Sequence, residues 1–184
     1  IVGFGNLSMP RQTRLQFQYA RRLQYRFKDT ELNGTYDLKL NLNSQFSERY
    51  QFGTNIGRHV APVHFIEVPE EGRLATNRFW VRMQASKQLD VGLSYNFQKM
   101  TTMDKKTDYF SGYTTTLSAS YQQNKSLEFQ VLAKYNDFSK TFQIQPLLTY
   151  QPCPFTIFYI GSTQNQKVIT LSYDAIDAGQ LTNN

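Results

Sequence analysis

The chain has 184 residues, which is enough for one folded domain and short for two. Its formal net charge is +6, 18% of its residues are charged and 15% are aromatic, and this composition excludes an intrinsically disordered chain. The single cysteine, Cys153, excludes an intramolecular disulfide, and no apolar stretch approaches the roughly 18 residues that a transmembrane helix needs.

The predicted elements are β-strands, in which apolar residues recur at every second position. Taken in chain order, the alternation starts near Thr13 and is regular over residues 36–43, 78–85, 90–98 and 127–136. Further runs start near Tyr50, Tyr113, Phe142, Phe155 and Lys167. The pattern predicts about ten strands in all, and a helical spacing fits none of the runs better.

The lengths of the runs and of the links between them favour a membrane barrel over a soluble sandwich. Several runs keep alternating for about nine to eleven residues, the number that crosses a bilayer at barrel tilt, whereas soluble strands have about five or six. Short turns also alternate with longer links, as in outer-membrane barrels. The short turns are predicted near residues 47–49, 86–88, 122–126 and 151–154, and the longer links at 28–35, 58–76, 99–112 and 136–140.

The predicted fold class is therefore all-β. It is an antiparallel up-and-down transmembrane β-barrel of about ten strands, either complete or part of a larger barrel. The barrel is predicted to occupy residues 13–174, between an N-terminal periplasmic extension of residues 1–12 and a polar C-terminal tail of residues 175–184. With an even number of strands, both ends are expected to face the periplasm together with the short turns. The alternative is a soluble β-sandwich or barrel that acts as a binding module.

Strand alternation assigns side chains to two faces of the predicted barrel. The lipid face is expected to carry girdles of aromatic residues near the strand ends. These are Tyr36, Tyr50, Phe79, Phe97, Tyr113, Tyr121, Tyr135 and Tyr150. Arg21 falls on the same face, between Tyr19 and Leu23. A charge at mid-membrane costs about 2 to 4 kcal/mol, so a bulge, a protein partner or a different register is expected at Arg21.

The opposite face is expected to line a lumen that is polar and net basic. Its charged candidates are Arg22, Arg26, Lys39, Arg78, Arg82, Glu128 and Lys134. A barrel of about ten strands is largely filled by its own side chains, because open pores need about sixteen strands. The charges therefore predict either a narrow anion-selective path or a plug of paired charges and amides, and the plug is favoured.

Three hairpins resemble the repeating barrel hairpins of Gram-negative outer-membrane proteins. Their sequences are RFWVRMQASKQLDVGLSYNF, TTLSASYQQNKSLEFQVLAKY and FQIQPLLTYQPCPFTIFYIGSTQN. The last is similar to the C-terminal barrel of an uncharacterised family that joins a carbohydrate-binding-module-like periplasmic domain to an outer-membrane barrel. The resemblance covers about the last half of the chain. It implies a closing Phe or Trp in the final strand, and the strand expected at residues 167–173 departs from this pattern.

Catalytic and cofactor-binding patterns are poor, so the chain is predicted not to be an enzyme and to need no metal or cofactor. The two histidines, His59 and His64, fall in the predicted loop at residues 58–76 beside three glutamates. Their spacing matches no defined metal or acid/base motif, and a solvated loop of mixed charge explains the same residues.

The basic residues form no concentrated stripe, so nucleic acid is not expected as a partner. Those at the rim are expected instead to contact anionic membrane lipid or lipopolysaccharide. They are Arg58, Arg73, Lys99, Lys105 and Lys106. The predicted function is a structural anchor or component of an assembly in the cell outer membrane, with other outer-membrane or periplasmic proteins as partners. The alternative is a narrow, weakly anion-selective transport or translocon-associated channel.

Overall fold

The computed structural model describes residues 1–22, 25–27, 30–32, 34–63 and 70–167, and the secondary structure in these ranges is all β. The strands are β1 (Val2–Met9), β2 (Thr13–Arg22), β3 (Tyr25–Phe27), β4 (Thr30–Leu32), β5 (Thr35–Gln45), β6 (Tyr50–Pro62), β7 (Glu71–Gln84), β8 (Leu89–Thr102), β9 (Asp108–Gln122), β10 (Leu127–Asn136), β11 (Thr141–Cys153), β12 (Thr156–Gly161) and β13 (Gln164–Lys167). The central strands have 13 to 15 residues, which is long for a soluble sheet.

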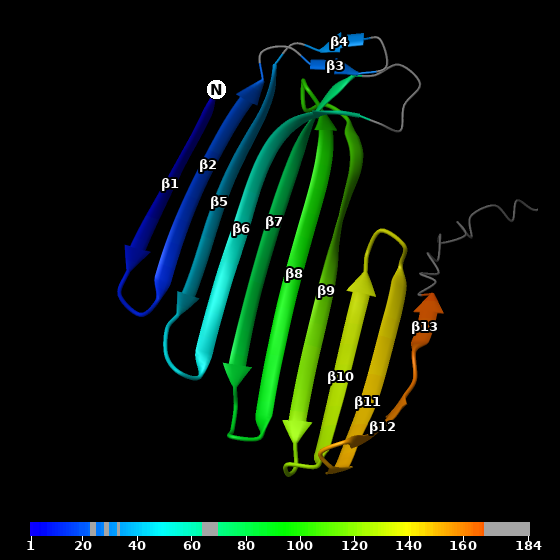
Figure 1. Cartoon of the computed structure of the whole chain (residues 1–184). Coiled ribbons are helices and arrows are strands. Elements are labelled where there is room, and N and C mark those ends of the chain that lie inside the picture. Colours follow the sequence, from blue (N-terminus) through cyan, green and yellow to red (C-terminus); the bar gives the residue numbers. More distant parts are fainter. Residues whose placement is uncertain (23–24, 28–29, 33, 64–69, 168–184) are drawn as a thin grey trace, which may run out of the picture.

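Ten strands form one antiparallel up-and-down sheet in the order β1-β2-β5-β6-β7-β8-β9-β10-β11-β12 (Figure 1). The short β3–β4 hairpin is inserted between β2 and β5 and is separate from the sheet. β13 follows β12 along the chain and pairs with the other end of β11. The predicted all-β, up-and-down architecture of about ten strands is confirmed.

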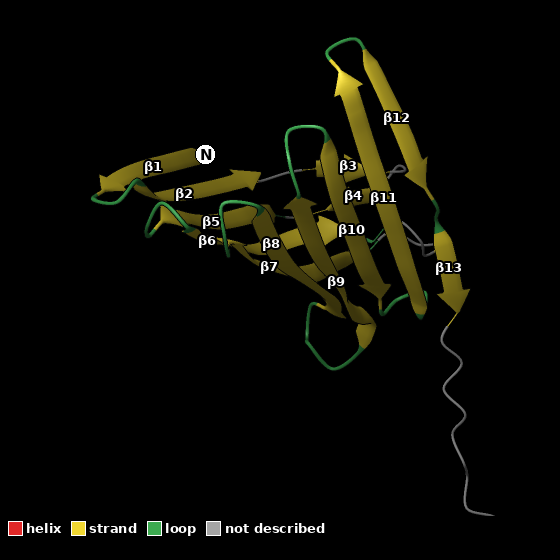
Figure 2. Ribbon diagram, turned by 90° about the horizontal axis from the view of Figure 1, so that it is seen from below, coloured by secondary structure: helices red, strands yellow, loops and turns green. Residues whose placement is uncertain are grey.

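The sheet is open, so the predicted closed barrel is not formed. It is strongly curved, and within the described residues no hydrogen-bonded ladder joins β1 to β12 (Figure 2). An open sheet and a closed barrel have the same alternation of side chains along each strand, so the sequence pattern does not distinguish them.

The first strand lies in a segment that the sequence pattern assigned to an extension of residues 1–12. β1 pairs with β2 in continuous register from Val2↔Ala20 to Met9↔Thr13. The alternation is hidden because Gly3 and Gly5 occupy one face where apolar side chains are expected.

The sheet begins with β1 at the end that carries the longer loops, and β13, the last described strand, pairs with β11 at that end (Figure 1). β1 starts there, and the first turn, between Met9 and Thr13, lies at the opposite end with the other short turns. The prediction that the N-terminal segment faces the periplasm is therefore incompatible with the prediction that the short turns face it. The discrepancy arises because adding β1 reverses the direction in which the sheet begins.

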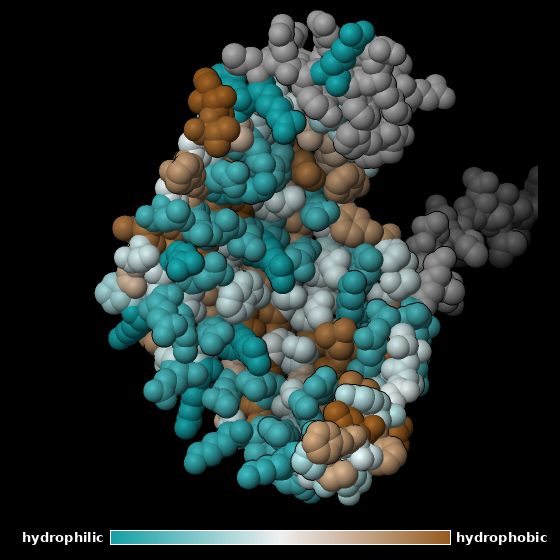
Figure 3. Space-filling view, viewed as in Figure 1, coloured by the Kyte–Doolittle hydropathy of each residue, from teal (hydrophilic) through white to brown (hydrophobic). Residues whose placement is uncertain are grey.

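The two faces of the sheet have opposite character. Residues paired across antiparallel strands point to the same face, and the register from Asn6↔Gln16 through Arg78↔Asn96 to Asn136↔Thr141 traces a polar face across the sheet. Figure 3 looks onto this polar face, which is the concave one in Figure 2. The convex face carries most of the apolar and aromatic residues of the central strands.

The described residues have almost no hydrophobic core. Their buried hydrophobic side chains are Val60, Val63 and Met100, all toward the long-loop end. Gly72 lies beside two of them, because a Cβ atom there would approach Met100 Cε to 2.7 Å and Val63 Cγ2 to 3.0 Å. The remaining large apolar side chains are mostly exposed, including Phe79 at 50% and Leu117 at 47%.

Candidate functional site

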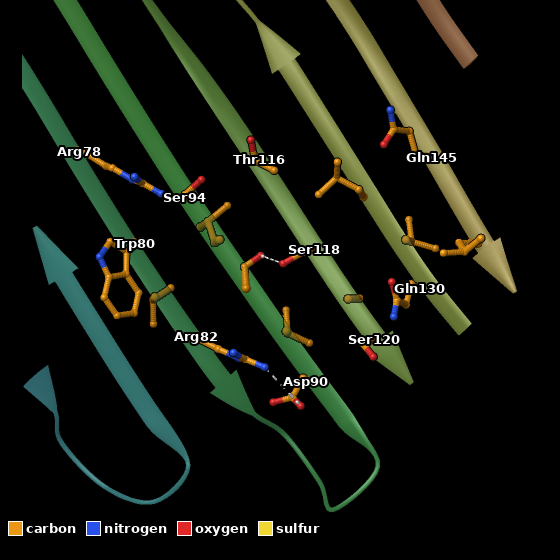
Figure 4. A pocket seen from close by; sticks show the side chains of 18 residues that line it. Arg78, Trp80, Arg82, Asp90, Ser94, Thr116, Ser118, Ser120, Gln130 and Gln145 are labelled. Atoms are coloured by element: carbon orange, nitrogen blue, oxygen red, sulfur yellow. Dashed lines mark hydrogen bonds and ion pairs between the residues drawn. The ribbon is translucent and has the colours of Figure 1, made fainter. Parts of the chain in front are cut away.

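The candidate site is a hollow of about 580 Å³ on the concave face, between β7 and β11 (Figure 4). The lining residues labelled in Figure 4 are Trp80 and the polar residues Arg78, Arg82, Asp90, Ser94, Thr116, Ser118, Ser120, Gln130 and Gln145. The volume arises because consecutive concave positions of β9, namely Thr116, Ser118 and Ser120, carry short side chains. Gly92 of β8 faces Ser118 directly and adds no side chain of its own.

Polar contacts cross the floor of the hollow. Ser120 Oγ donates a hydrogen bond to Glu128 Oε1 at 2.7 Å, and Gln130 Nε2 donates to the same oxygen at 2.9 Å. Arg82 Nη2 lies 3.8 Å from Asp90 Oδ2, at the short-turn end of the hollow. Arg78 has no ion-pair partner among the described residues, so the hollow is net basic on its β7 side.

The structure places six of the seven predicted lumen residues on this concave face. By register these are Arg22, Lys39, Arg78, Arg82, Glu128 and Lys134. Arg26 does not join them, because β2 ends at Arg22 and Arg26 lies in the separate β3–β4 hairpin. The spacing that assigned Arg26 to this face continues the alternation past the end of β2.

A second polar cluster lies on the concave face near the long-loop end. Asp37 accepts a hydrogen bond from Lys39 Nζ at 2.7 Å, and its other oxygen lies 2.9 Å from His59 Nδ1. His59 Nε2 lies 3.5 Å from Thr76 Oγ1. Because β6 extends to Pro62, His59 lies in a strand and not in the loop predicted at residues 58–76. The other predicted loop histidine, His64, lies outside the described residues.

The convex face carries all eight residues predicted as aromatic girdles. Tyr36, Phe97, Tyr113 and Tyr135 lie toward the long-loop end, while Tyr50, Tyr121 and Tyr150 lie toward the short-turn end. Phe79 differs, because it lies midway along β7 and not near a strand end. The other seven lie in two groups toward opposite ends of the sheet, and their role as girdles in contact with lipid stays a prediction.

Sequence reasoning missed one member of an aromatic row. The rings of Tyr95 and Tyr113 have centroids 5.4 Å apart, and those of Tyr113 and Tyr135 are 5.8 Å apart. This row crosses β8, β9 and β10 on the convex face. Alternation gives the face of Tyr95 but not its neighbours, which depend on the register between strands.

Arg21 lies on the convex face in unbroken register, paired with Tyr36. It is the last residue but one of β2, at the long-loop end. The bulge or altered register predicted for it is therefore absent in β2, because its position at the end of the strand keeps the charge away from the middle of the apolar face.

The part of the chain that the structure describes contains no cluster of three or more His, Cys, Asp or Glu side chains able to hold a metal ion. It also contains no helix long and apolar enough to span a membrane.

Comparison with known proteins gives no relative for this chain. No family model matches the sequence, and neither a curated protein nor a solved structure matches it. The resemblance of its hairpins to those of outer-membrane proteins therefore stays an expectation.

Proposed function

We propose that this chain is a β-barrel wall in the outer membrane of a Gram-negative cell, where it acts as a structural anchor or a component of a membrane assembly. The observation that carries the proposal is the polarity of the curved sheet. Its convex face exposes apolar and aromatic side chains, and its polar side chains gather on the concave face. This is the arrangement of an outer-membrane barrel, with its apolar side toward lipid.

The soluble alternative explains this arrangement less well. A soluble sheet packs its apolar face against another layer, because burial of apolar area is the main favourable term in folding. Here convex apolar residues such as Phe17 on β2, Phe79 on β7 and Phe142 on β11 are exposed, and Val60, Val63 and Met100 are the buried hydrophobic residues of the described ranges. Lipid would cover the convex face without requiring a second protein layer.

The height of the apolar face fits a bilayer. On β8 the convex positions are apolar from Leu89 to Phe97, and the next one is Lys99. On β10 they run from Leu127 to Tyr135, and β11 has a matching run from Phe142 to Tyr150. Each run covers nine residues, within the number that crosses the hydrocarbon core at barrel tilt, which is about nine to eleven.

Membrane insertion requires the open edges to pair. Unpaired N–H and C=O groups at a sheet edge are not tolerated in hydrocarbon, so a lipid-embedded sheet must close. β1 and β12 run antiparallel in a ten-strand up-and-down sheet, so they have the relative direction that closure needs. We propose that these two edges meet when the chain enters a bilayer.

A channel is the second candidate function, and the specific observation that favours it is the cationic side of the hollow. Arg78 has no ion-pair partner among the described residues, and Lys134 lies on the same face. The network of Ser120, Gln130 and Glu128 favours a filled interior instead. We therefore place the anchor first.

The proposed function predicts a folded barrel that does not conduct. The chain refolded in lipid vesicles should migrate differently on a gel before and after boiling, as intact membrane barrels do, and should give no stable conductance steps in a planar bilayer. Anion-selective conductance steps whose selectivity falls in the Arg78→Gln variant would instead support the channel function over the anchor. Failure to enter lipid, with the chain folded in water, would refute both functions.

The native cysteine gives a direct test of orientation. Cys153 is exposed at the short-turn end of the sheet. If this end faces the periplasm, a maleimide carrying a large polymer should label Cys153 only after the outer membrane of producing cells is permeabilised. The matched control, Cys153→Ser with Lys106→Cys, moves the thiol to the long-loop end and should be labelled in intact cells. The opposite labelling pattern would show that the short-turn end faces the outside of the cell.

A further inference from the structure

The convex face changes from apolar to cationic at its long-loop end. Arg21, Arg58, Arg73 and Lys99 lie there on β2, β6, β7 and β8, and the register places them all on the convex side. Arg58 on β6 and Lys99 on β8 are both paired with Ala75 on β7, so the small side chain of Ala75 lies between two cations on the strands that flank β7. The row lies directly beyond the apolar run that ends at Phe97 on β8.

A cavity of about 250 Å³ opens among these cations. It is lined by the convex side chains of Tyr36, Arg58, Arg73, Lys99 and Thr101, and by Lys105 from the turn between β8 and β9. Four of these six are cationic, and Tyr36 and Thr101 add hydroxyl groups. The set provides several N–H and O–H donors around a space that accommodates a phosphate group.

Arg58 and Arg73, which line this cavity, keep N–H donors that are not used in hydrogen bonds within the described residues. Arg58 is held by hydrogen bonds from its Nη1 to Asn77 Oδ1 at 2.9 Å and to the Gly57 carbonyl at 2.7 Å. Nε of Arg73 is buried and has no hydrogen-bond partner among the described residues, and a buried unpaired donor is costly. A bound oxyanion would satisfy it.

Nearby carboxylates compensate only part of the positive charge. Asp108 forms an ion pair of 2.7 Å with Lys99, and Glu71 precedes Arg73 by two residues on the same face. Asp104 Oδ2 lies 4.0 Å from Lys106 Nζ. The hydroxyl of Thr102 and the backbone N–H of Lys106 donate hydrogen bonds to Asp104 Oδ1, and these bonds lower the pKa of Asp104. Arg58 and Lys105 have no carboxylate partner within the described ranges.

We infer that this cavity binds the phosphate group of an anionic lipid at the rim of the barrel, an inference that rests on the proposed membrane function. The position selects a lipid over a free phosphate ion. The cavity lies immediately beyond the apolar belt, so a headgroup bound there leaves its acyl chains against the convex face, alongside the row of Tyr95, Tyr113 and Tyr135. Arginine and lysine are the side chains that bind phosphate most strongly.

The test uses the full chain refolded in a zwitterionic detergent and titrated with a short-chain phosphatidic acid, with binding followed by calorimetry. Phosphatidylcholine of the same chain length and inorganic phosphate are the reference ligands. The triple variant Arg58→Gln, Arg73→Gln, Lys105→Gln should bind phosphatidic acid on the order of 100-fold more weakly. Each cation contributes about 1 kcal/mol to binding, and about 1.4 kcal/mol corresponds to a tenfold change in affinity. The matched control Arg49→Gln, Lys87→Gln, Lys125→Gln removes the same charge at the short-turn end and should bind normally.

The outcomes separate this site from the membrane function. A heat-modifiability gel on each sample reports folding, so loss of binding counts only for a variant that stays folded. Restored binding in the Arg58→Lys, Arg73→Lys, Lys105→Arg variant would support a charge-based site. Equal binding of phosphatidylcholine, or an equal loss in the control variant, would overturn the site while the barrel stands. Inorganic phosphate bound as tightly as phosphatidic acid would overturn the assignment to lipid.

Discussion

Replacing Leu93 by arginine should lower the free energy of unfolding from a bilayer by about 2 to 4 kcal/mol, which is the cost of a charge on the lipid face at the midplane. Leu93 lies at the centre of the apolar run on β8, paired with Val81 and Leu117 on the neighbouring strands. All three side chains are exposed on the convex face, Leu93 at 45%. Urea titration of the chain in lipid vesicles measures the change.

The adjacent residue supplies the control for this prediction. Ser94 lies on the concave face and lines the hollow, so Ser94→Arg should change the folding free energy far less. In a soluble protein Leu93→Arg would be the less destabilising of the two substitutions. An arginine that replaces an exposed leucine costs little there, whereas an arginine that replaces a side chain lining a hollow costs more. If Leu93→Arg left the free energy of unfolding in lipid vesicles unchanged, contact between the convex face and the membrane would therefore be refuted.

The division of side chains between the two faces was predictable from the sequence because the period of a strand is two residues. Alternation alone places Arg78 and Lys134 on one face and Tyr113 and Tyr135 on the other, and the register agrees. It fails where local chemistry hides it. In β1, glycines occupy apolar-face positions and hide the alternation. Arg26 has the spacing of a β2 residue, but β2 ends at Arg22 and Arg26 lies in the β3–β4 hairpin.

Features that depend on relations between strands were not predictable. The hollow depends on Gly92 and Ser118 facing each other across β8 and β9, and the cation site depends on Arg58 and Lys99 meeting across Ala75. A shift of one residue in either register would move these side chains to opposite faces. The sequence pattern therefore predicts the composition of each face but not the sites on it.

Closure of the sheet is the second large effect that we expect. In a Cys153→Ser chain, cysteines replacing Asn6 on β1 and Tyr159 on β12 both face the concave side, according to their pairing with Gln16 and Thr149. A short bifunctional maleimide should link them within one chain after insertion into vesicles, which gives a monomer of altered gel mobility. Before insertion the edges are open, and little linkage within the chain is expected.

The control pair distinguishes closure from collapse of the chain. Cysteines replacing Asn6 on β1 and Ser94 on β8 also share the concave face, but β8 is five strands from β1 in either direction around a closed ten-strand sheet. This pair should stay unlinked in lipid. Dimers and larger species from the Asn6 and Tyr159 pair would mean that copies of the chain close one another's edges. In that case the anchor is an oligomer, because hydrocarbon requires both edges to be paired whichever chain supplies the partner.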